Sequence, residues 1–201
     1  YHGLLLSLRH HSHQLLSSVA YTYSKTTDQG TGYFNQFDQA SQRGPSQLDQ
    51  PHRLVIASTW SPEVRPLRHF EIGAVINIAS GRPYNAVFDN PEVNFSIVPG
   101  ERFNSFRGPN VRNFDFNVTR NFHLGERYVL RFTAEAFNVF NHPNYQQNTV
   151  DNVQYTLTQQ PDAGVNNSVW TAAPNSNFGA PLAMVPRFGA RSFQFSSRFS
   201  F

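Results

Sequence analysis

The carboxy-terminal end of the chain alternates between two kinds of side chain with a period of two. Four aromatic residues fall on one face of an extended segment, and they are Phe193, Phe195, Phe199 and Phe201. Only Ser197 interrupts this series, and polar residues fill the positions between. Such alternation is typical of a strand between an apolar and a watery medium. A membrane-spanning strand has about this length, roughly 9 to 11 residues, so the chain end predicts the closing strand of a transmembrane β-barrel.

The same period of two recurs along the whole sequence. It predicts seven strands, at residues 1–9, 14–25, 53–60, 68–79, 112–122, 127–137 and 192–201. One face of these strands is apolar and is expected to contact lipid, through Leu4, Leu6, Leu8, Val19, Phe70, Ile72, Ile76, Ile78, Phe114, Phe116, Leu130, Phe132, Phe193 and Phe195. The facing of segment 53–60 stays open, because both of its faces are nearly equally apolar.

The connections between these segments alternate strictly between short and long. The short ones are residues 10–14, 61–67 and 123–126, and the long ones are 26–52, 80–111 and 138–189. Bacterial outer-membrane barrels have short periplasmic turns and long extracellular loops. With the carboxy-terminus on the periplasmic side, every connection agrees with this rule. The sequence therefore predicts an all-β, antiparallel, up-and-down transmembrane barrel located in the outer membrane.

The composition agrees with a barrel and excludes a helical membrane protein. Only 14% of the 201 residues are charged, against roughly 25% in soluble domains. The mean hydropathy is −0.47, and no uninterrupted apolar run approaches the roughly 18 residues of a membrane helix. Seven strands do not match the even number of a closed single-chain barrel. We therefore expect residues 1–201 to be the carboxy-terminal part of one barrel domain, without its signal peptide.

Several motifs resemble the carboxy-terminal end of TonB-dependent outer-membrane receptors of the Oar-like branch. They include 21–26 (YTYSKT), 80–84 (SGRPY), 106–109 (FRGP), 131–138 (RFTAEAFN) and 140–144 (FNHPN), and they follow one another along nearly the whole chain. The resemblance implies a 22-stranded barrel filled by an amino-terminal plug domain, which is absent from these residues. It also implies uptake of a bulky, unidentified nutrient, driven by the TonB complex through the plug.

Two groups of residues are candidates for a functional role. Charged residues on the polar faces are expected to face the lumen, where they would bind substrate or pair with the plug, and these are Glu71, Asp115, Arg131, Glu135 and Arg198. The terminal aromatic residues Phe193, Phe195, Phe199 and Phe201 are, by the resemblance, part of the signal read by the barrel-assembly machinery. Arg131 and Glu135 lie about 14 Å apart along one strand, so we expect each to meet a neighbouring strand or the plug.

Other kinds of site are less well supported. His10, His11 and His13 offer imidazole ligands, but a solvated periplasmic turn explains them better than a metal site, and we expect no cofactor. No Gly-x-Ser-x-Gly or His-Glu-x-x-His pattern occurs, so we expect no enzyme. The arginines are scattered rather than clustered, which argues against nucleic acid as a partner. Aromatic residues in the long connections favour packing between loops over stacking on a ligand, and these are Tyr33, Phe34, Phe37, Tyr84, Phe88, Tyr155 and Trp170.

Two alternative functions stay open at this point. One is a general porin or a structural outer-membrane barrel, which would have the same strands but no plug. The other is a soluble carbohydrate-binding β-sandwich, since a soluble antiparallel sheet also alternates with a period of two. The sandwich accounts less well for the long connections, because loops beyond about 15 residues are uncommon in compact soluble domains.

Overall fold

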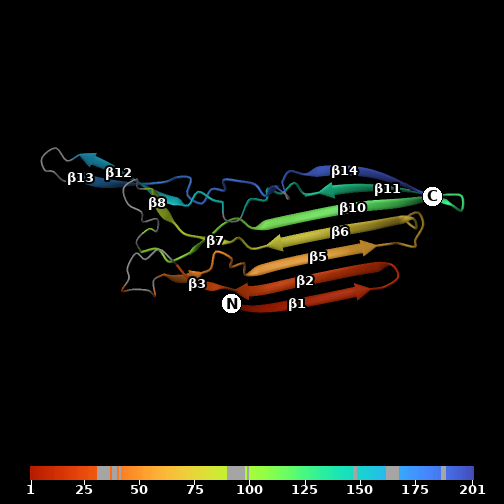
Figure 1. The fold of residues 1–201 in the computed structure, drawn as a ribbon, viewed down its shortest axis with the longest axis horizontal. Helices are drawn as coiled ribbons and strands as arrows, with labels where there is room; N and C mark the ends of the chain where they lie inside the picture. The colour runs from red at the N-terminus through yellow and green to blue at the C-terminus, as the bar shows by residue number, and fades with distance from the viewer. Residues whose placement is uncertain are drawn as a thin grey trace.

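The computed structural model describes residues 1–30, 37, 40, 42–89, 98, 100–146, 149–161, 168–186 and 189–201. Its main element is a seven-stranded sheet (Figure 1). The strands are β1 (His2–His11), β2 (Leu15–Lys25), β5 (His52–Trp60), β6 (Phe70–Ala79), β10 (Val111–Leu124), β11 (Tyr128–Phe137) and β14 (Ser192–Ser200). Each strand corresponds to one predicted segment. Among the described residues, no helix is long and apolar enough to span a membrane.

The sheet is an antiparallel meander in which the seven strands pair in the order in which they follow one another. The short turns lie at one end of the strands and the long connections at the other (Figure 1). The predicted antiparallel, up-and-down arrangement is therefore confirmed. It follows from the pattern itself, because consecutive strands joined by short turns can pair only as antiparallel neighbours.

Some strand boundaries differ from the prediction. Strand β10 continues past Phe122 to Leu124, because His123 and Leu124 pair with the first residues of β11. The turn expected at 123–126 is thus a tighter one, and Gly125 adopts a φ of 74° within it. Strand β1 likewise extends to His11, and β6 begins at Phe70 rather than at residue 68.

The register between strands decides the facing of segment 53–60. Ile56 of β5 lies directly opposite Val19 of β2 on one side and Ile76 of β6 on the other. Opposite residues of an antiparallel pair point to the same face. Leu54, Ile56 and Trp60 therefore belong to the apolar face, which extends across the sheet from β1 to β14. Local sequence could not decide this, since Val55 and Ala57 on the other face are nearly as apolar.

Neither face of the sheet is covered in the described part of the chain. Apart from prolines, the buried apolar side chains among the described ones are Ala79, Ala86, Val111 and Val150, all at an end of the long connections or within them. Large apolar side chains along the strands stay exposed, such as Leu8 and Phe195. A β-sandwich would bury one face against a second sheet. The exposed apolar face instead fits a wall that contacts lipid.

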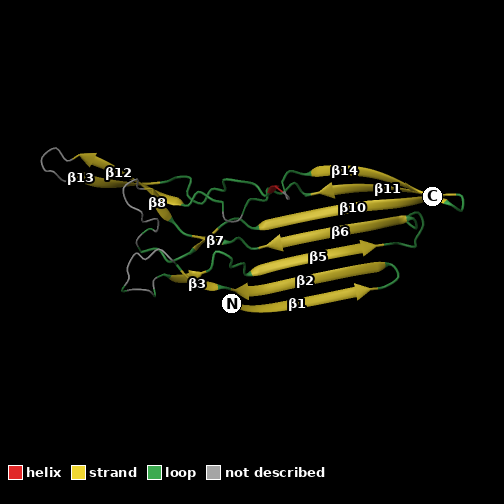
Figure 2. Cartoon of the chain, in the orientation of Figure 1, coloured by secondary structure: helices red, strands yellow, loops and turns green. Residues whose placement is uncertain are grey.

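The long connections contain short strands that the sequence did not predict. They are β3 (Thr27–Gln29), β4 (Arg43–Pro45), β7 (Pro83–Tyr84), β8 (Val87–Asp89), β9 (Phe106–Arg107), β12 (Val153–Pro161) and β13 (Ser168–Pro174). Three small sheets result, and they extend beyond the end of the main sheet (Figure 2). Strand β8 pairs in parallel with β12, which joins the second long connection to the third.

Candidate functional site

The polar face of the main sheet carries all five charged residues predicted to face the lumen. By register, Glu71 lies opposite Thr119, and Asp115 lies opposite Val75. Arg131 lies between Asn121 and Arg198, and Glu135 between Asn117 and Gln194. The five residues thus share one face, but they are spread along its whole length rather than gathered in one site.

Arg131 and Arg198 form the closest charged pair of this set. They are directly opposite on β11 and β14, near the end that carries the short turns. Arg131 Nε donates a hydrogen bond to Asn121 Oδ1 over 2.9 Å, so one of the two meets a neighbouring strand. Like charges directly opposite destabilise a sheet. Within the described residues neither arginine has an ion pair with a carboxylate, which leaves this position suited to an anionic group.

Asp115 has a structural partner. Its Oδ1 accepts a hydrogen bond of 2.9 Å from the backbone N–H of Asn138, the residue that follows β11. Asn138 has a φ of 48°, a conformation that asparagine tolerates better than most residues. Its side-chain amide donates to the carbonyls of His142 and Gly189. Asp115 therefore anchors the start of the third long connection, a role that its predicted place in the lumen did not suggest.

A concave region of about 530 Å³ lies mainly on the polar face, across β1, β2, β5, β6 and β10. Small side chains create it, because Ala57 and Gly73 occupy adjacent strands where larger residues would fill the space. A Cβ at Gly73 would come within 2.5 Å of the Asn117 side chain. Arg9 and Asn117 supply polar groups at its edge. The region is large enough for part of a ligand or of another domain.

The first two long connections are joined by an ion pair whose carboxylate is buried. Arg107 Nη2 lies 2.5 Å from Asp49 Oδ2, and the side chain of Asp49 is only 2% exposed. The other carboxylate oxygen accepts a 2.6 Å hydrogen bond from the backbone of Thr26, and Arg107 Nη1 also donates to the Gly81 carbonyl. A buried carboxylate without such partners would be strongly destabilising. The pair fixes the first long connection against the second.

An aromatic cluster joins the second connection to the third. Phe106 and Phe178 meet edge to face with ring centroids 5.0 Å apart, and Tyr84 lies 5.8 Å and 6.0 Å from them. Burial raises the pKa of Tyr84 above the ordinary 10.0. The interpretation that loop aromatic residues pack against other loops is confirmed for Tyr84. Tyr33 and Phe34 lie outside the described residues, as does the side chain of Trp170.

Two glycines in the long connections, Gly44 and Gly81, each lie against the backbone of the second connection. A Cβ at Gly81 would lie 1.8 Å from the carbonyl oxygen of Gly108, and one at Gly44 would lie 2.0 Å from that of Phe103. Asn104, only 1% exposed, donates from its amide to the Pro45 carbonyl over 2.8 Å. The glycines are therefore required because two backbones approach each other closely at these positions.

The short turns also contact one another. His13 Nε2 lies 2.9 Å from Glu63 Oε1, and Gln14 donates to the other oxygen of the same carboxylate. The sequence offered no carboxylate near His13, because Glu63 belongs to the next short turn. In the part of the chain that is described, no three histidine, cysteine, aspartate or glutamate side chains come together to hold a metal ion.

A family model described as an outer membrane beta barrel domain matches the chain in two overlapping segments, residues 1–98 and 72–180. The matched residues include six of the seven strands of the main sheet and the greater part of the long connections. No curated protein and no solved structure matches the chain.

Proposed function

Because the chain belongs to the outer membrane β-barrel domain family, we propose that it forms part of the wall of a TonB-dependent receptor. The protein lies in the outer membrane of a Gram-negative bacterium. In the proposed role, the long connections capture a bulky nutrient outside the cell. The ligand then passes along the polar face as the TonB complex acts on a plug domain inside the barrel.

The joined assembly of long connections is the observation that carries this proposal. The Asp49–Arg107 pair, the Tyr84 cluster and the β8–β12 pairing hold three connections together at one end of the sheet. Loops held on a rigid scaffold are where proteins place ligand-binding residues. Extracellular loops joined in this way suit a receptor that binds its ligand before transport. A general porin needs only an open, water-filled passage.

The polar face supports a plug domain as the partner inside the barrel. Arg131 and Arg198 lie side by side without a carboxylate partner among the described residues. The concave region lined by Ala57 and Gly73 leaves room for a contacting side chain. In the proposed receptor an acidic group of the plug, or of the ligand, pairs with the two arginines. Such a pair inside the barrel is worth more than one on an exposed surface.

The edges of the main sheet support a larger barrel. Among the described residues β1 pairs only with β2, and β14 only with β11. In lipid, unpaired backbone groups at a sheet edge cost several kcal/mol each. Further strands on both edges would remove this cost, as in the 22-stranded barrel that the resemblance implies.

Conductance of the full-length protein in a planar lipid bilayer tests the proposal. A barrel filled by a plug should show no steady ion current, and current should appear once mild urea loosens the plug. Open, stepwise conductance from the outset would contradict the receptor and favour the general porin. A second experiment measures uptake of candidate nutrients by cells with and without the TonB complex. A nutrient whose uptake is lost without the complex would be identified as the ligand.

A further inference from the structure

We propose that the apolar face carries a binding site for a glycerophospholipid of the periplasmic leaflet, in which Arg120 holds the lipid phosphate. The site is independent of the nutrient pathway, because it lies on the opposite face of the sheet from Arg131 and Glu135. The proposal rests first on the position of Arg120, a charged residue whose neighbours on this face are apolar.

The register places Arg120 unambiguously on the apolar face. It lies directly opposite Phe70 of β6 on one side and Phe132 of β11 on the other. Phe132 in turn lies opposite Ser197 of β14, the residue that interrupts the terminal aromatic series. Phe70, Arg120, Phe132 and Ser197 thus form one row across four strands. A cation and a hydroxyl on the apolar face, Arg120 and Ser197, therefore stand at the same depth.

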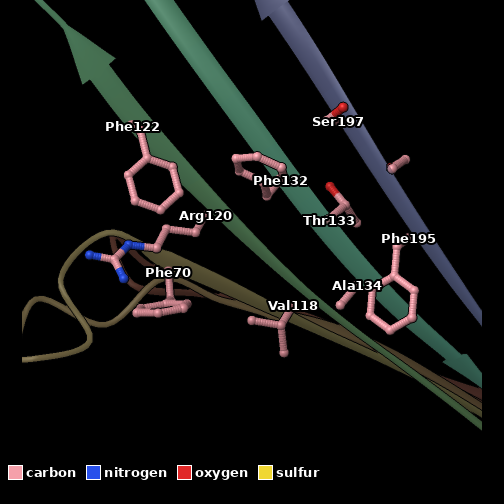
Figure 3. A pocket seen from close by; sticks show the side chains of 10 residues that line it. Phe70, Val118, Arg120, Phe122, Phe132, Thr133, Ala134, Phe195 and Ser197 are labelled. Carbon is pink, nitrogen blue, oxygen red and sulfur yellow. The ribbon is translucent and has the colours of Figure 1, made fainter.

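The guanidinium of Arg120 is held by aromatic rings and pairs with no carboxylate among the described residues. Its Cζ lies 4.8 Å from the ring centroid of Phe70 and 4.6 Å from that of Phe122 (Figure 3). Both contacts are within the range of cation–π attraction. Within the described residues its buried Nε has no hydrogen-bond partner, and no carboxylate pairs with it. The rings therefore hold the guanidinium in place but neutralise its charge only in part.

A hollow of about 420 Å³ opens beside Arg120 and continues toward the centre of the strands. Its lining includes Phe132, Ala134 and Phe195 (Figure 3). Ala134 lies between Val118 of β10 and Phe195 of β14, so a small residue separates two larger ones and leaves a groove. A groove with apolar walls and a cation at one end matches an acyl chain joined to a phosphate.

The depth of Arg120 fits the headgroup level of a membrane. Phe122, Leu130 and Phe199 form the next row toward the short turns. Arg120 lies two residues further in, about 7 Å along a tilted strand. A long arginine side chain spans such a distance to reach the interface. The carboxy-terminal, short-turn end is periplasmic by the length rule, and phospholipid forms that leaflet. The apolar face itself meets lipid, which favours a lipid over a protein as the occupant.

Native mass spectrometry of the full-length protein, extracted in mild detergent, tests the site. We expect wild type to retain added phosphatidylglycerol, and Arg120→Gln to weaken this binding about tenfold through loss of a charge-assisted contact. The matched control is Arg112→Gln, which removes a charge from the same face of the same strand at its other end, opposite Ile78. Its retention of phosphatidylglycerol should equal that of wild type.

Two further arms separate the parts of the site. Ala134→Phe fills the groove and should weaken phosphatidylglycerol binding although Arg120 is intact. This variant keeps the proposal testable if Arg120→Gln fails to insert into the membrane. Diacylglycerol lacks the phosphate and should be retained poorly by wild type. Equal retention in wild type and Arg120→Gln, or equal loss in Arg112→Gln, would overturn the proposal. The proposal would also be overturned if wild type retained diacylglycerol as well as it retains phosphatidylglycerol. Binding of inorganic phosphate with no retention of phosphatidylglycerol would overturn it too.

Discussion

The buried carboxylate of Asp49 forms an ion pair with Arg107 although 58 positions separate the two residues in the chain. One residue lies between β4 and β5, and the other lies in β9, so the pair closes the first long connection onto the second. Because Asp49 accepts hydrogen bonds at both carboxylate oxygens, it is the central residue of the assembly that we propose captures the ligand.

Asp49→Asn should loosen the assembly of long connections. The substitution removes the buried charge of the pair, and we expect a cost of about 1–3 kcal/mol rather than the larger cost of leaving a buried charge unpaired. The reason is that the Arg107 side chain is 37% exposed and can be rehydrated. Limited trypsin digestion of intact cells should cut the loops faster. Asp28→Asn is the control, because the Asp28 side chain is exposed. Among the described contacts this side chain accepts a hydrogen bond only from the adjacent Gln29 N–H.

Gly81→Ala should have a similar effect through the backbone. Its Cβ would overlap the Gly108 carbonyl, and the forced shift is expected to cost about 1–3 kcal/mol, as overpacking does elsewhere. Gly189→Ala is the matched control, since its Cβ would meet nothing closer than 3.8 Å. Equal protease resistance of the two variants in intact cells would show that the close approach of Gly81 to Gly108 does not hold the loops together.

Ile76→Lys and Val75→Lys test which face of the sheet meets lipid. The two residues are adjacent in β6 and point to opposite faces. A lysine on the lipid face costs about 2–4 kcal/mol at the bilayer midplane, whereas a lysine in the lumen meets water. Ile76→Lys should lower the amount of folded protein in outer-membrane fractions, and Val75→Lys should leave it near wild type. The reverse result would invert the assignment of the two faces.

Phe201→Ala should slow insertion without changing the stability of the inserted protein. The Phe201 side chain is 96% exposed, so its removal forfeits little packing apart from the ring contact with Phe199. The rate of insertion by the barrel-assembly machinery should fall, while the urea midpoint of the folded protein stays the same. Phe116→Ala, a lipid-facing aromatic far from the chain end, is the control. An unchanged insertion rate for Phe201→Ala would contradict the proposed signal.

The strands of the main sheet could be predicted because their pattern is local. Alternation of Phe114, Phe116 and Val118 with polar residues fixes β10 without knowledge of any neighbour. The facing of β5 could not be predicted, since it depends on pairing of Ile56 with Val19 and Ile76. The loop assembly could not be predicted either, because its contacts join residues that are distant in the sequence.

Arg120 is a residue that sequence reasoning missed although the signal was available. A strict count by twos from Phe114 through Val118 reaches Arg120 before Phe122, so the period itself assigns it to the apolar face. The apolar residues around it obscured a single charge. Its contacts with Phe70 and Phe122 required the structure, since Phe70 belongs to another strand.

Labelling of single cysteines in whole cells tests the central claim most directly, namely that this wall has its long connections outside the cell and its short turns in the periplasm. The chain has no cysteine, so each introduced thiol reports one position. Asp28→Cys and Asn175→Cys lie in the long connections, and Glu126→Cys lies in the turn between β10 and β11. With a membrane-impermeant maleimide, the account predicts labelling of the first two in intact cells and of Glu126→Cys only after the outer membrane is opened. Labelling of Glu126→Cys in intact cells, with the other two protected, would contradict it.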